Sequence, residues 1–385
     1  MSEEMKNLNN EQPSETPVEK VEPKVEAKKP LDKKTIGIIA GVAAAVVVLI
    51  VVLAIVLGGG KDPVPTLNDY TLGMGIVVDL GSSKEGNAQV DATVATVVLD
   101  KDGKIVLCRI DAVQNKAALN EDGTFTIKNL KTKMELGDDY GMAGKVDGNN
   151  DGVKLEWYEQ AKAFEKHVIG MTGEQVANME TAPNFMNYQM STDEALLAAG
   201  CTIQITDFKA AVAKACKDDQ SVSFKSEGNF TLGVAANSFD DNSSAASADE
   251  DGVIKMYADF AASVVEDGKI VASLNDAIQP NISFNLAGEV TTSFKATKRE
   301  LKEGYGMAGK VDANNDGVKL EWYEQSKAFS AHVVGMTAEQ VANMETAPNF
   351  MNYQMSTDDA LLSAGCTIQI TAIKAVVAES VTNAR

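Results

Sequence analysis

Residues 89–113 read QVDATVATVVLDKDGKIVLCRIDAV, and this stretch predicts a β-hairpin. In residues 89–99, polar and β-branched residues alternate, which is typical of a half-buried strand. Residues 100–104 form a turn, with a glycine where a positive φ is needed. Residues 105–113 then return as the second strand, and residues 124–127 give a further short strand.

A helical half follows the hairpin. Trp157, Ala161, Phe164 and Val168 recur at spacings of four, three and four residues, which places them on one face of a helix over residues 155–168. The fold of this part of the chain is therefore expected to be α+β, with antiparallel strands first and helices packed on them afterwards.

Four shorter elements complete the helical half. Residues 172–175 (TGEQ) and 191–194 (STDE) have the spacing of capping boxes, so each is expected to open a short helix at its first residue. Residues 201–205 are predicted to be a strand, and residues 207–214 a closing helix.

The strand segment and the helical segment both occur twice in the sequence. Residues 140–206 recur at residues 305–371 without a gap, and the two segments are identical at 59 of 67 positions. Upstream, residues 257–265 and 270–278 repeat the hairpin at lower identity. Self-similarity of this kind indicates a duplicated structural unit.

The predicted architecture is α+β, a tandem repeat of two antiparallel-sheet-plus-helices domains behind one N-terminal transmembrane helix. The first repeat domain spans residues 66–216 and the second spans residues 230–385, with a short polar linker between them. Each repeat is about 155 residues long, a size that can hold its own hydrophobic core.

Residues 35–57 read TIGIIAGVAAAVVVLIVVLAIVL, a run of 23 residues without a charge. At about 1.5 Å per residue, this run is long enough to cross a bilayer as a helix. A buried core helix fits less well because such helices carry polar positions. A cleaved signal peptide fits less well because the run is long and follows a polar segment.

That polar segment, residues 1–34, is rich in Glu, Lys, Pro, Asn and Ser and is expected to be a disordered cytoplasmic tail. Four lysines lie between residues 28 and 34, directly before the apolar run. The positive-inside rule therefore places the N-terminus in the cytoplasm and the C-terminal domains outside the cell membrane, to which the single span of residues 35–57 anchors them.

The chain carries 55 acidic and 35 basic residues, a formal net charge of −20. Phosphate contact needs a basic face, so nucleic acid is excluded as a general partner. With two His in 385 residues, a His-rich metal centre is excluded and a Ser-His-Asp triad is disfavoured.

The DATVATVVLDKDGKIV hairpin, the EWYEQ helix and the Gly-Cys-Thr strand before a closing helix resemble a known family. They are similar to the extracytoplasmic FMN-binding-domain proteins of anaerobic Gram-positive bacteria. Those membrane-anchored proteins are relatives of the flavin-bearing subunits of Na⁺-pumping and Rnf-type electron-transport complexes. The resemblance covers both repeats and implies FMN as the cofactor.

In that family, a Thr in an Asp-x-x-Ser-Gly-Ala-Thr pattern carries FMN through a phosphoester bond. The resemblance assigns this cofactor site to Gly200 and Thr202, and to Gly365 and Thr367 in the second repeat. The chain departs from the pattern, because Ala and Cys replace the Ser and the Ala, and Leu replaces the acidic residue. Covalent flavin, non-covalent flavin and a plain buried strand therefore stay open as interpretations.

Two further segments match the first half of a calcium-binding loop, with oxygen-bearing residues at positions 1, 3 and 5 and glycine at position 6. The metal-site residues predicted in this way are Asp147, Asn149, Asp151, Asp312, Asn314 and Asp316. Position 12 holds Tyr158 or Tyr323 instead of the bidentate Glu. A calcium site and a metal-free turn leading into a helix both stay open.

Two functions are consistent with these patterns. The first is a membrane-anchored extracytoplasmic protein with two FMN-binding-like domains, which serves flavin-based extracellular electron transfer with membrane electron-transport components. The alternative is a non-catalytic cell-surface binding module, stabilised by calcium, with cell-wall partners. No catalytic residue is assigned, enzymatic activity stays open, and a disulfide between Cys201 and Cys216 is a further open prediction.

Overall fold

The structure is a computed structural model that describes residues 67–144, 154–184, 186–309, 319–349 and 352–385. The predicted cytoplasmic tail and transmembrane helix lie outside the described residues. In the described ranges, no helix combines the length and the apolar character that a membrane crossing requires. From residue 67 onward, the chain forms one compact unit.

The α+β class is confirmed, with antiparallel sheets and α-helices in both halves of this unit. The elements of the first half are β1 (Asn68–Asp79), β2 (Asn87–Leu99), β3 (Ile105–Leu119), β4 (Phe125–Asn129), α2 (Lys133–Leu136), η1 (Gly137–Tyr140), α3 (Trp157–His167), α4 (Gly173–Ala177), β5 (Thr181–Pro183), β6 (Gln189–Ser191), α5 (Glu194–Ala198), α6 (Thr206–Ala215) and β7 (Val222–Ser226).

The second half contains a closely similar series. Its elements are β8 (Thr231–Asp240), β9 (Gly252–Ile254), β10 (Met256–Glu266), β11 (Lys269–Ile278), β12 (Asn281–Phe284), β13 (Val290–Ser293), α7 (Lys298–Leu301), η2 (Lys302–Tyr305), α8 (Trp322–His332), α9 (Ala338–Ala342), β14 (Thr346–Pro348), β15 (Gln354–Ser356), α10 (Asp359–Ser363) and α11 (Thr371–Thr382).

The strands of the first half form a five-stranded sheet in the order β4-β3-β2-β1-β7. The second half has two three-stranded sheets, β11-β10-β8 and β13-β12-β9. The registers correspond, because Thr71 of β1 faces Leu99 of β2, and Thr231 of β8 faces Val265 of β10. The predicted hairpins are confirmed in both halves, because β2 pairs with β3 and β10 pairs with β11, both antiparallel.

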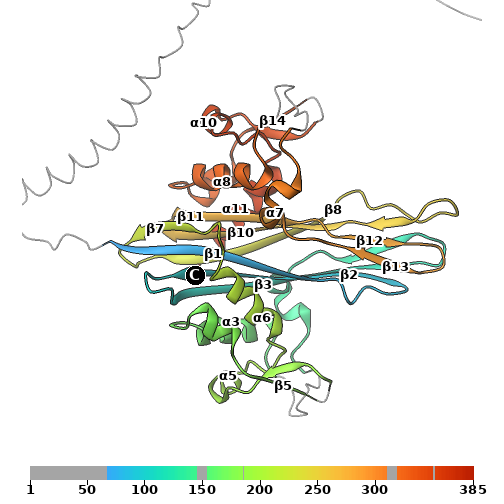
Figure 1. The fold of residues 1–385 in the computed structure, drawn as a ribbon, viewed down its shortest axis with the longest axis horizontal. Helices are drawn as coiled ribbons and strands as arrows, with labels where there is room; N and C mark the ends of the chain where they lie inside the picture. The colour runs from blue at the N-terminus through green and yellow to red at the C-terminus, as the bar shows by residue number, and fades with distance from the viewer. Residues whose placement is uncertain (1–66, 145–153, 185, 310–318, 350–351) are drawn as a thin grey trace, which may run out of the picture. The chain divides into compact units, whose positions relative to one another are not determined.

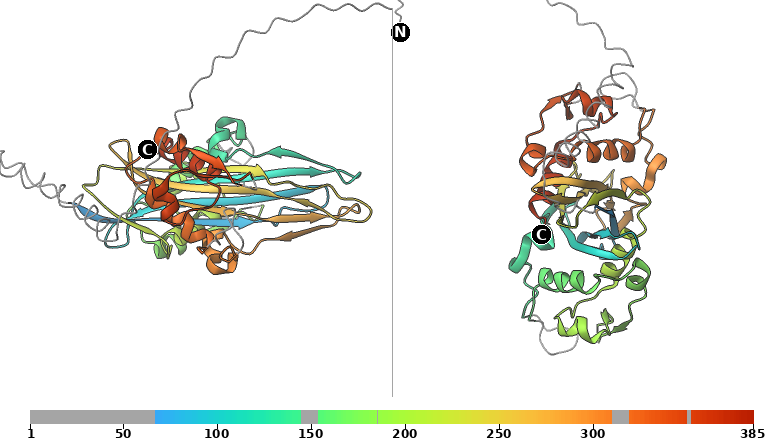
Figure 2. Two further views of the ribbon diagram at one scale, coloured as in Figure 1. Left: turned by 90° about the horizontal axis from the view of Figure 1, so that it is seen from above. Right: turned by 90° about the vertical axis from the view of Figure 1, so that its left-hand side faces the viewer.

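One hydrophobic cluster lies between the two sheet systems and takes residues from both halves. Leu72, Val94 and Val98 of the first half belong to it, together with Leu232 and Phe260 of the second. Helices α3 and α6 cover the outer face of the first sheet, while α8 and α11 cover the second (Figures 1 and 2). The order of layers is helices, sheet, sheet, helices.

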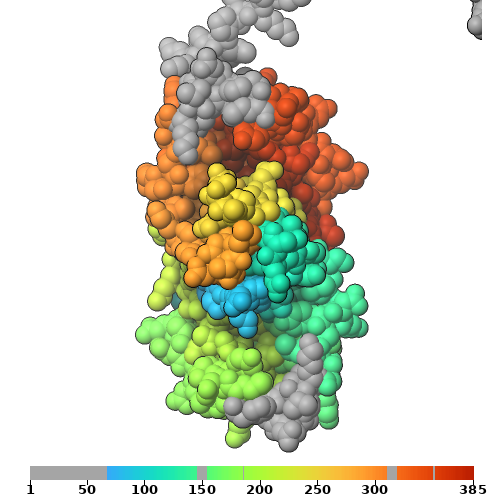
Figure 3. All heavy atoms as spheres, turned by 90° about the vertical axis from the view of Figure 1, so that its right-hand side faces the viewer, coloured from blue at the N-terminus to red at the C-terminus, as the bar shows by residue number. Residues whose placement is uncertain are grey.

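The two halves also meet at the ends of their strands. The N–H of Ala246, in the β8–β9 connection, donates to the carbonyl of Gly123, in the β3–β4 turn, at 2.9 Å. Figure 3 views this end of the molecule, where the segment near residue 120 lies against the segment near residue 250. The β-hairpins of the two halves are thus joined along their length and at their tips.

Strand β2 differs from the half-buried strand that its alternation predicts. Ala92, Val94 and Val98 face the shared cluster between the sheets, whereas Ala95 and Val97 face the helices. The second part of the strand is therefore buried on both faces, because a helix layer lies on one side and a second sheet on the other.

The predicted helices are present as α3, α4, α5 and α6, but two local predictions are wrong. The N-cap of α5 is Asp193, whose carboxylate accepts the N–H of Leu196 at 2.9 Å, and not the serine two residues earlier. Residues 201–205 make no strand and contribute an isolated bridge between Gln204 and Met190. The polar linker contains strand β7, which pairs with β1.

The inter-sheet layer contains a buried amide that has no partner. Asn115 of β3 is fully buried, and neither its Nδ2 nor its Oδ1 makes a hydrogen bond in the described part of the chain. An unsatisfied buried polar group costs about 1–3 kcal/mol. We expect Asn115→Leu to raise the free energy of unfolding by about 1–3 kcal/mol in urea melts. Unchanged or lower stability would mean that the amide has a partner, such as water.

Candidate functional site

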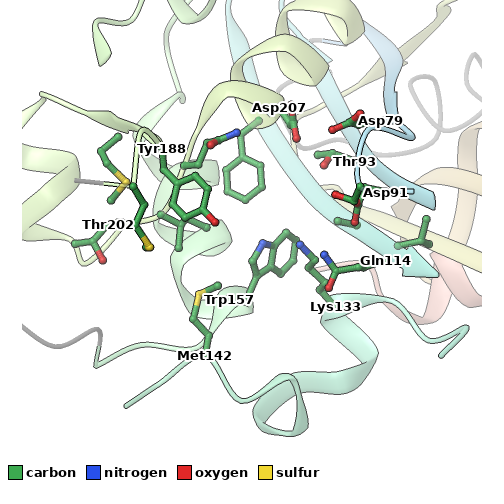
Figure 4. A pocket seen from close by; sticks show the side chains of 18 of the residues that line it. Asp79, Asp91, Thr93, Gln114, Lys133, Met142, Trp157, Tyr188, Thr202 and Asp207 are labelled. Atoms are coloured by element: carbon green, nitrogen blue, oxygen red, sulfur yellow. The ribbon is translucent and has the colours of Figure 1, made fainter. Parts of the chain in front are cut away.

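A cleft opens on the helix-covered face of the first sheet, with a volume of about 520 Å³. Strands β1, β2 and β3 form one wall, and α2, α3, the start of α6 and the segment around Tyr188 form the others (Figure 4). Its size lies within the usual range of small-molecule sites, about 300–1,000 Å³. It is therefore the candidate site.

Aromatic rings line the middle of the cleft. Trp157, the first residue of α3, is 3% exposed and packs edge-on against Phe208 of α6, with ring centroids 5.6 Å apart. Tyr188 borders the same space from the β5–β6 hairpin and is 49% exposed (Figure 4). The cleft thus combines a rigid aromatic floor with an aromatic ring that is free to adjust.

The position of Trp157 follows from the start of its helix. The carboxylate of Glu156 caps α3 and also accepts the N–H groups of Met142 and Ala143, at 2.8 and 2.9 Å. Glu159 completes the capping box, because its carboxylate accepts the N–H of Glu156 at 2.9 Å. These bonds fix the first turn of α3 and hold the indole at the floor of the cleft.

Lys133 of α2 is the basic residue of the described lining. Its Nζ lies 5.3 Å from the centre of the Trp157 ring and 5.1 Å from that of Tyr140. Both distances are within the range of cation–π attraction. An ammonium group is therefore already accommodated beside the aromatic floor.

Carboxylates dominate one end of the cleft. Asp79 of β1 stands directly opposite Asp91 of β2, and Asp207 lies in the first turn of α6. Burial raises the pKa of Asp207 above its ordinary value; Asp79 and Asp91 add to this rise, and Lys133 opposes it. Like charges placed opposite each other across two strands are destabilising, so this arrangement costs stability.

Thr202, predicted to carry FMN, also lines the cleft, at a distance from the carboxylates (Figure 4). Its backbone N–H donates to Gln160 Oε1 at 2.8 Å, and its hydroxyl lies 3.4 Å from the same oxygen. Gly200 has a φ of 91°, which only glycine adopts readily. The structure thus brings Thr202 to the site, with its hydroxyl directed to the amide of α3.

The second half keeps this local geometry at Gly365 and Thr367. The N–H of Thr367 donates to Gln325 Oε1 at 2.8 Å, and Gly365 has a φ of 92°. The neighbouring strands differ, because Phe239 stands opposite Tyr257 where the first half has its two aspartates. The two rings pack edge-on at 6.3 Å.

The six residues predicted to bind calcium lie outside the described residues. The carboxylates that follow the two loops are described, and Glu156 and Glu321 both serve as helix caps that accept backbone N–H groups. In the described ranges, His, Cys, Asp and Glu form no group of three or more that could hold a metal ion. The calcium site stays a prediction.

The disulfide between Cys201 and Cys216 is absent, since all four cysteines are free. Burial raises the pKa of Cys201 and of Cys366 to about 12. Both thiols therefore stay protonated at neutral pH and act as packing groups.

Several lining residues had no functional interpretation in the sequence. In the sequence, Trp157 belongs to the apolar stripe of a helix, and Asp79, Asp91 and Asp207 match no motif. The signal that identifies the aspartates is the difference between the repeats, because Asp91 corresponds to Tyr257 in strand register, and Asp207 corresponds to Ala372. Trp157 gives no such signal, because Trp322 is its equivalent in the second repeat.

Comparisons with family models, with curated proteins and with solved structures find no match for this chain.

Proposed function

We propose that this chain is a membrane-anchored binding protein whose first repeat holds a flavin-type planar ring in the cleft beside Trp157. The observation that carries the proposal is the pairing of a buried indole with an exposed tyrosine, Tyr188, in a cleft of about 520 Å³. Offset stacking of aromatic rings contributes about 0.5–1.5 kcal/mol beyond the burial of their area.

The proposed cellular setting follows from the sequence. Residues 35–57 anchor the chain, the tail lies in the cytoplasm, and the tandem repeat domains lie outside the cell. A flavin held there supplies one- and two-electron chemistry, which suits exchange with membrane electron-transport components. The protein's own part is to bind and orient the ring and to exclude water from its buried face.

The cleft suits the ring of FMN better than its phosphate. The aromatic floor and Tyr188 match a planar ring, and Gln114 and Lys133 offer polar groups to its edge. Near Thr202, by contrast, Gln160 already occupies the N–H, and the basic residue of the described lining lies over Trp157. Phosphate is held by clustered N–H groups or cations. The FMN linkage at Thr202 and Thr367 therefore stays a prediction from the resemblance.

The second repeat favours the alternative role of a non-catalytic module. Phe239 and Tyr257 occupy the strand positions that are aspartates in the first repeat, and Ile373 replaces Phe208. We infer that the second repeat contributes one wall of the inter-sheet core and presents a surface for cell-wall partners. Calcium bound by Asp312, Asn314 and Asp316 of the second repeat would stabilise this surface.

The exposed tyrosines offer a matched pair of variants. Tyr188 and Tyr353 occupy equivalent positions and are each 49% exposed, so replacing either should leave the fold intact. We expect Tyr188→Ala to weaken riboflavin binding by about 3–10-fold, because one stacking partner is lost. Tyr353→Ala should leave the affinity unchanged in the same fluorescence-quenching titration. Equal effects of the two variants would refute the assignment of the site to the first repeat.

A further inference from the structure

We propose that the cleft selects a planar ligand that carries no phosphate and bears a positive charge at its carboxylate end. This inference rests on the proposed function and names the class of ligand that the site takes. It is carried by the charges of the lining, by an unpartnered hydroxyl that borders the cleft, and by the contrast between the two repeats.

The charges of the lining are unbalanced. One end of the cleft is lined by three carboxylates, those of Asp79, Asp91 and Asp207. Among the described lining residues, the single basic side chain is that of Lys133. Two of the carboxylates already accept neutral donors, since Gly81 N–H donates to Asp79 at 2.7 Å and the Gln89 amide donates to Asp91 at 2.6 Å. Neutral hydrogen bonds leave the negative charge in place. A dianionic phosphate entering this end would be repelled, whereas an ammonium group would be attracted.

A largely buried threonine at the same end has a hydroxyl without a hydrogen-bond partner in the described part of the chain. Thr93 of β2 is 8% exposed, lines the cleft and makes no side-chain hydrogen bond within the described ranges. Figure 4 shows it beside Asp79 and Asp91. The Thr93 hydroxyl is not sealed off from solvent, because it borders the cleft, where a ligand can supply a donor or an acceptor. Thr93 is therefore a polar contact left open for a ligand.

The second repeat shows that the fold does not need these carboxylates. There the cross-strand pair is Phe239 and Tyr257, and the hydroxyl of Tyr257 donates to Asn281 at 3.0 Å. The same backbone is thus maintained with aromatic residues at these positions. The fold therefore does not require carboxylates at these two positions, and the second repeat instead has a buried carboxylate, Asp259, at the register position of Thr93.

The charge selection should depend on pH through Asp207. The groups that face it are Asp79 on β1, Asp91 on β2 and Lys133 on α2. Burial raises the pKa of Asp207, so this carboxylate becomes neutral at a higher pH than an ordinary aspartate does. The affinity for a cationic ligand should therefore fall as the pH is lowered through that range, while the affinity for a neutral ring stays nearly constant.

The test compares three ligands with the same ring. Full-length chain is titrated with FMN, with riboflavin and with a flavin whose N10 side chain ends in a trimethylammonium group, at low ionic strength. We expect the cationic flavin to bind about tenfold more tightly than riboflavin, and FMN to bind most weakly. Added salt should narrow these differences.

The carboxylate variants supply the control. Asp79→Asn with Asp91→Asn should bring the three affinities within about threefold of one another. Asp249→Asn with Asp251→Asn removes the same charge from exposed positions outside the lining and should leave the order unchanged.

Three outcomes would overturn the inference. If FMN binds as tightly as the cationic flavin, the charge selection is wrong while flavin binding stands. If micromolar Ca²⁺ displaces the cationic flavin, the carboxylates prefer a metal ion. If none of the three flavins binds, the proposed function fails together with the inference.

Discussion

A chain that ends after residue 229 should lose its cooperative fold. The first repeat would then expose the sheet face that carries Leu72, Val94 and Val98, which the second half covers in the intact chain. Burying one such side chain contributes about 1.5–3 kcal/mol. Small domains have a net free energy of unfolding of only about 5–15 kcal/mol. Exposing this whole apolar face therefore removes more stabilisation than the isolated repeat has in total.

The measurement is thermal unfolding by circular dichroism, together with size-exclusion chromatography, on residues 66–229 and on residues 66–385. We expect the longer chain to melt cooperatively, and the shorter one to associate or to show no transition. A monomeric 66–229 fragment that melts cooperatively would contradict this account of the inter-sheet core. The sequence alone predicts such an independently folded repeat, because each repeat is long enough to hold its own core.

Replacement of Arg299 by methionine should have the second largest effect. Arg299 of α7 is 5% exposed, and its Nη2 donates to both carboxylate oxygens of Asp218 at 3.1 and 3.0 Å and to the carbonyl of Gln220 at 3.0 Å. Asp218 lies in the segment between the repeats and also accepts the N–H of Met74 of β1, at 3.1 Å. The ion pair thus joins the second half to the first sheet.

Arg299→Met leaves Asp218 buried without its counter-charge, which costs about 3–5 kcal/mol in the free energy of unfolding. The exposed pair of Lys225 and Asp69 provides the control, because Lys225→Met should cost at most about 1 kcal/mol. Urea melts of both variants provide the comparison. If Arg299→Met lowers the free energy of unfolding by no more than Lys225→Met does, the buried ion pair does not hold the two halves together.

The hairpins and the main helices could be predicted because their signals are local. The turn at residues 100–104 and the apolar stripe of α3 depend on neighbouring residues alone. Strand β1 was not predicted, and Gly73 and Gly75 explain why. A Cβ at Gly73 would lie 2.2 Å from the carbonyl oxygen of Ala215, and one at Gly75 would lie 2.3 Å from that of Ala211. Glycine normally weakens a strand, but here the close approach of α6 requires it.

The site was predicted only in part for a similar reason. The resemblance to the FMN-binding motif points to Thr202, and the structure places this residue in the cleft. Asp79, Asp91 and Asp207 are far apart in the sequence and are brought together by strand pairing and by the packing of α6. Their common feature, replacement by uncharged residues in the second repeat, becomes visible only when the strand register is known.

The most direct test of the central claim is the stoichiometry of flavin binding to the full-length chain, measured by equilibrium dialysis with riboflavin. The account predicts one flavin per chain. It also predicts that binding is lost when Asp79→Phe and Asp91→Tyr give the first repeat the residues of the second. Two flavins per chain, or none, would contradict it.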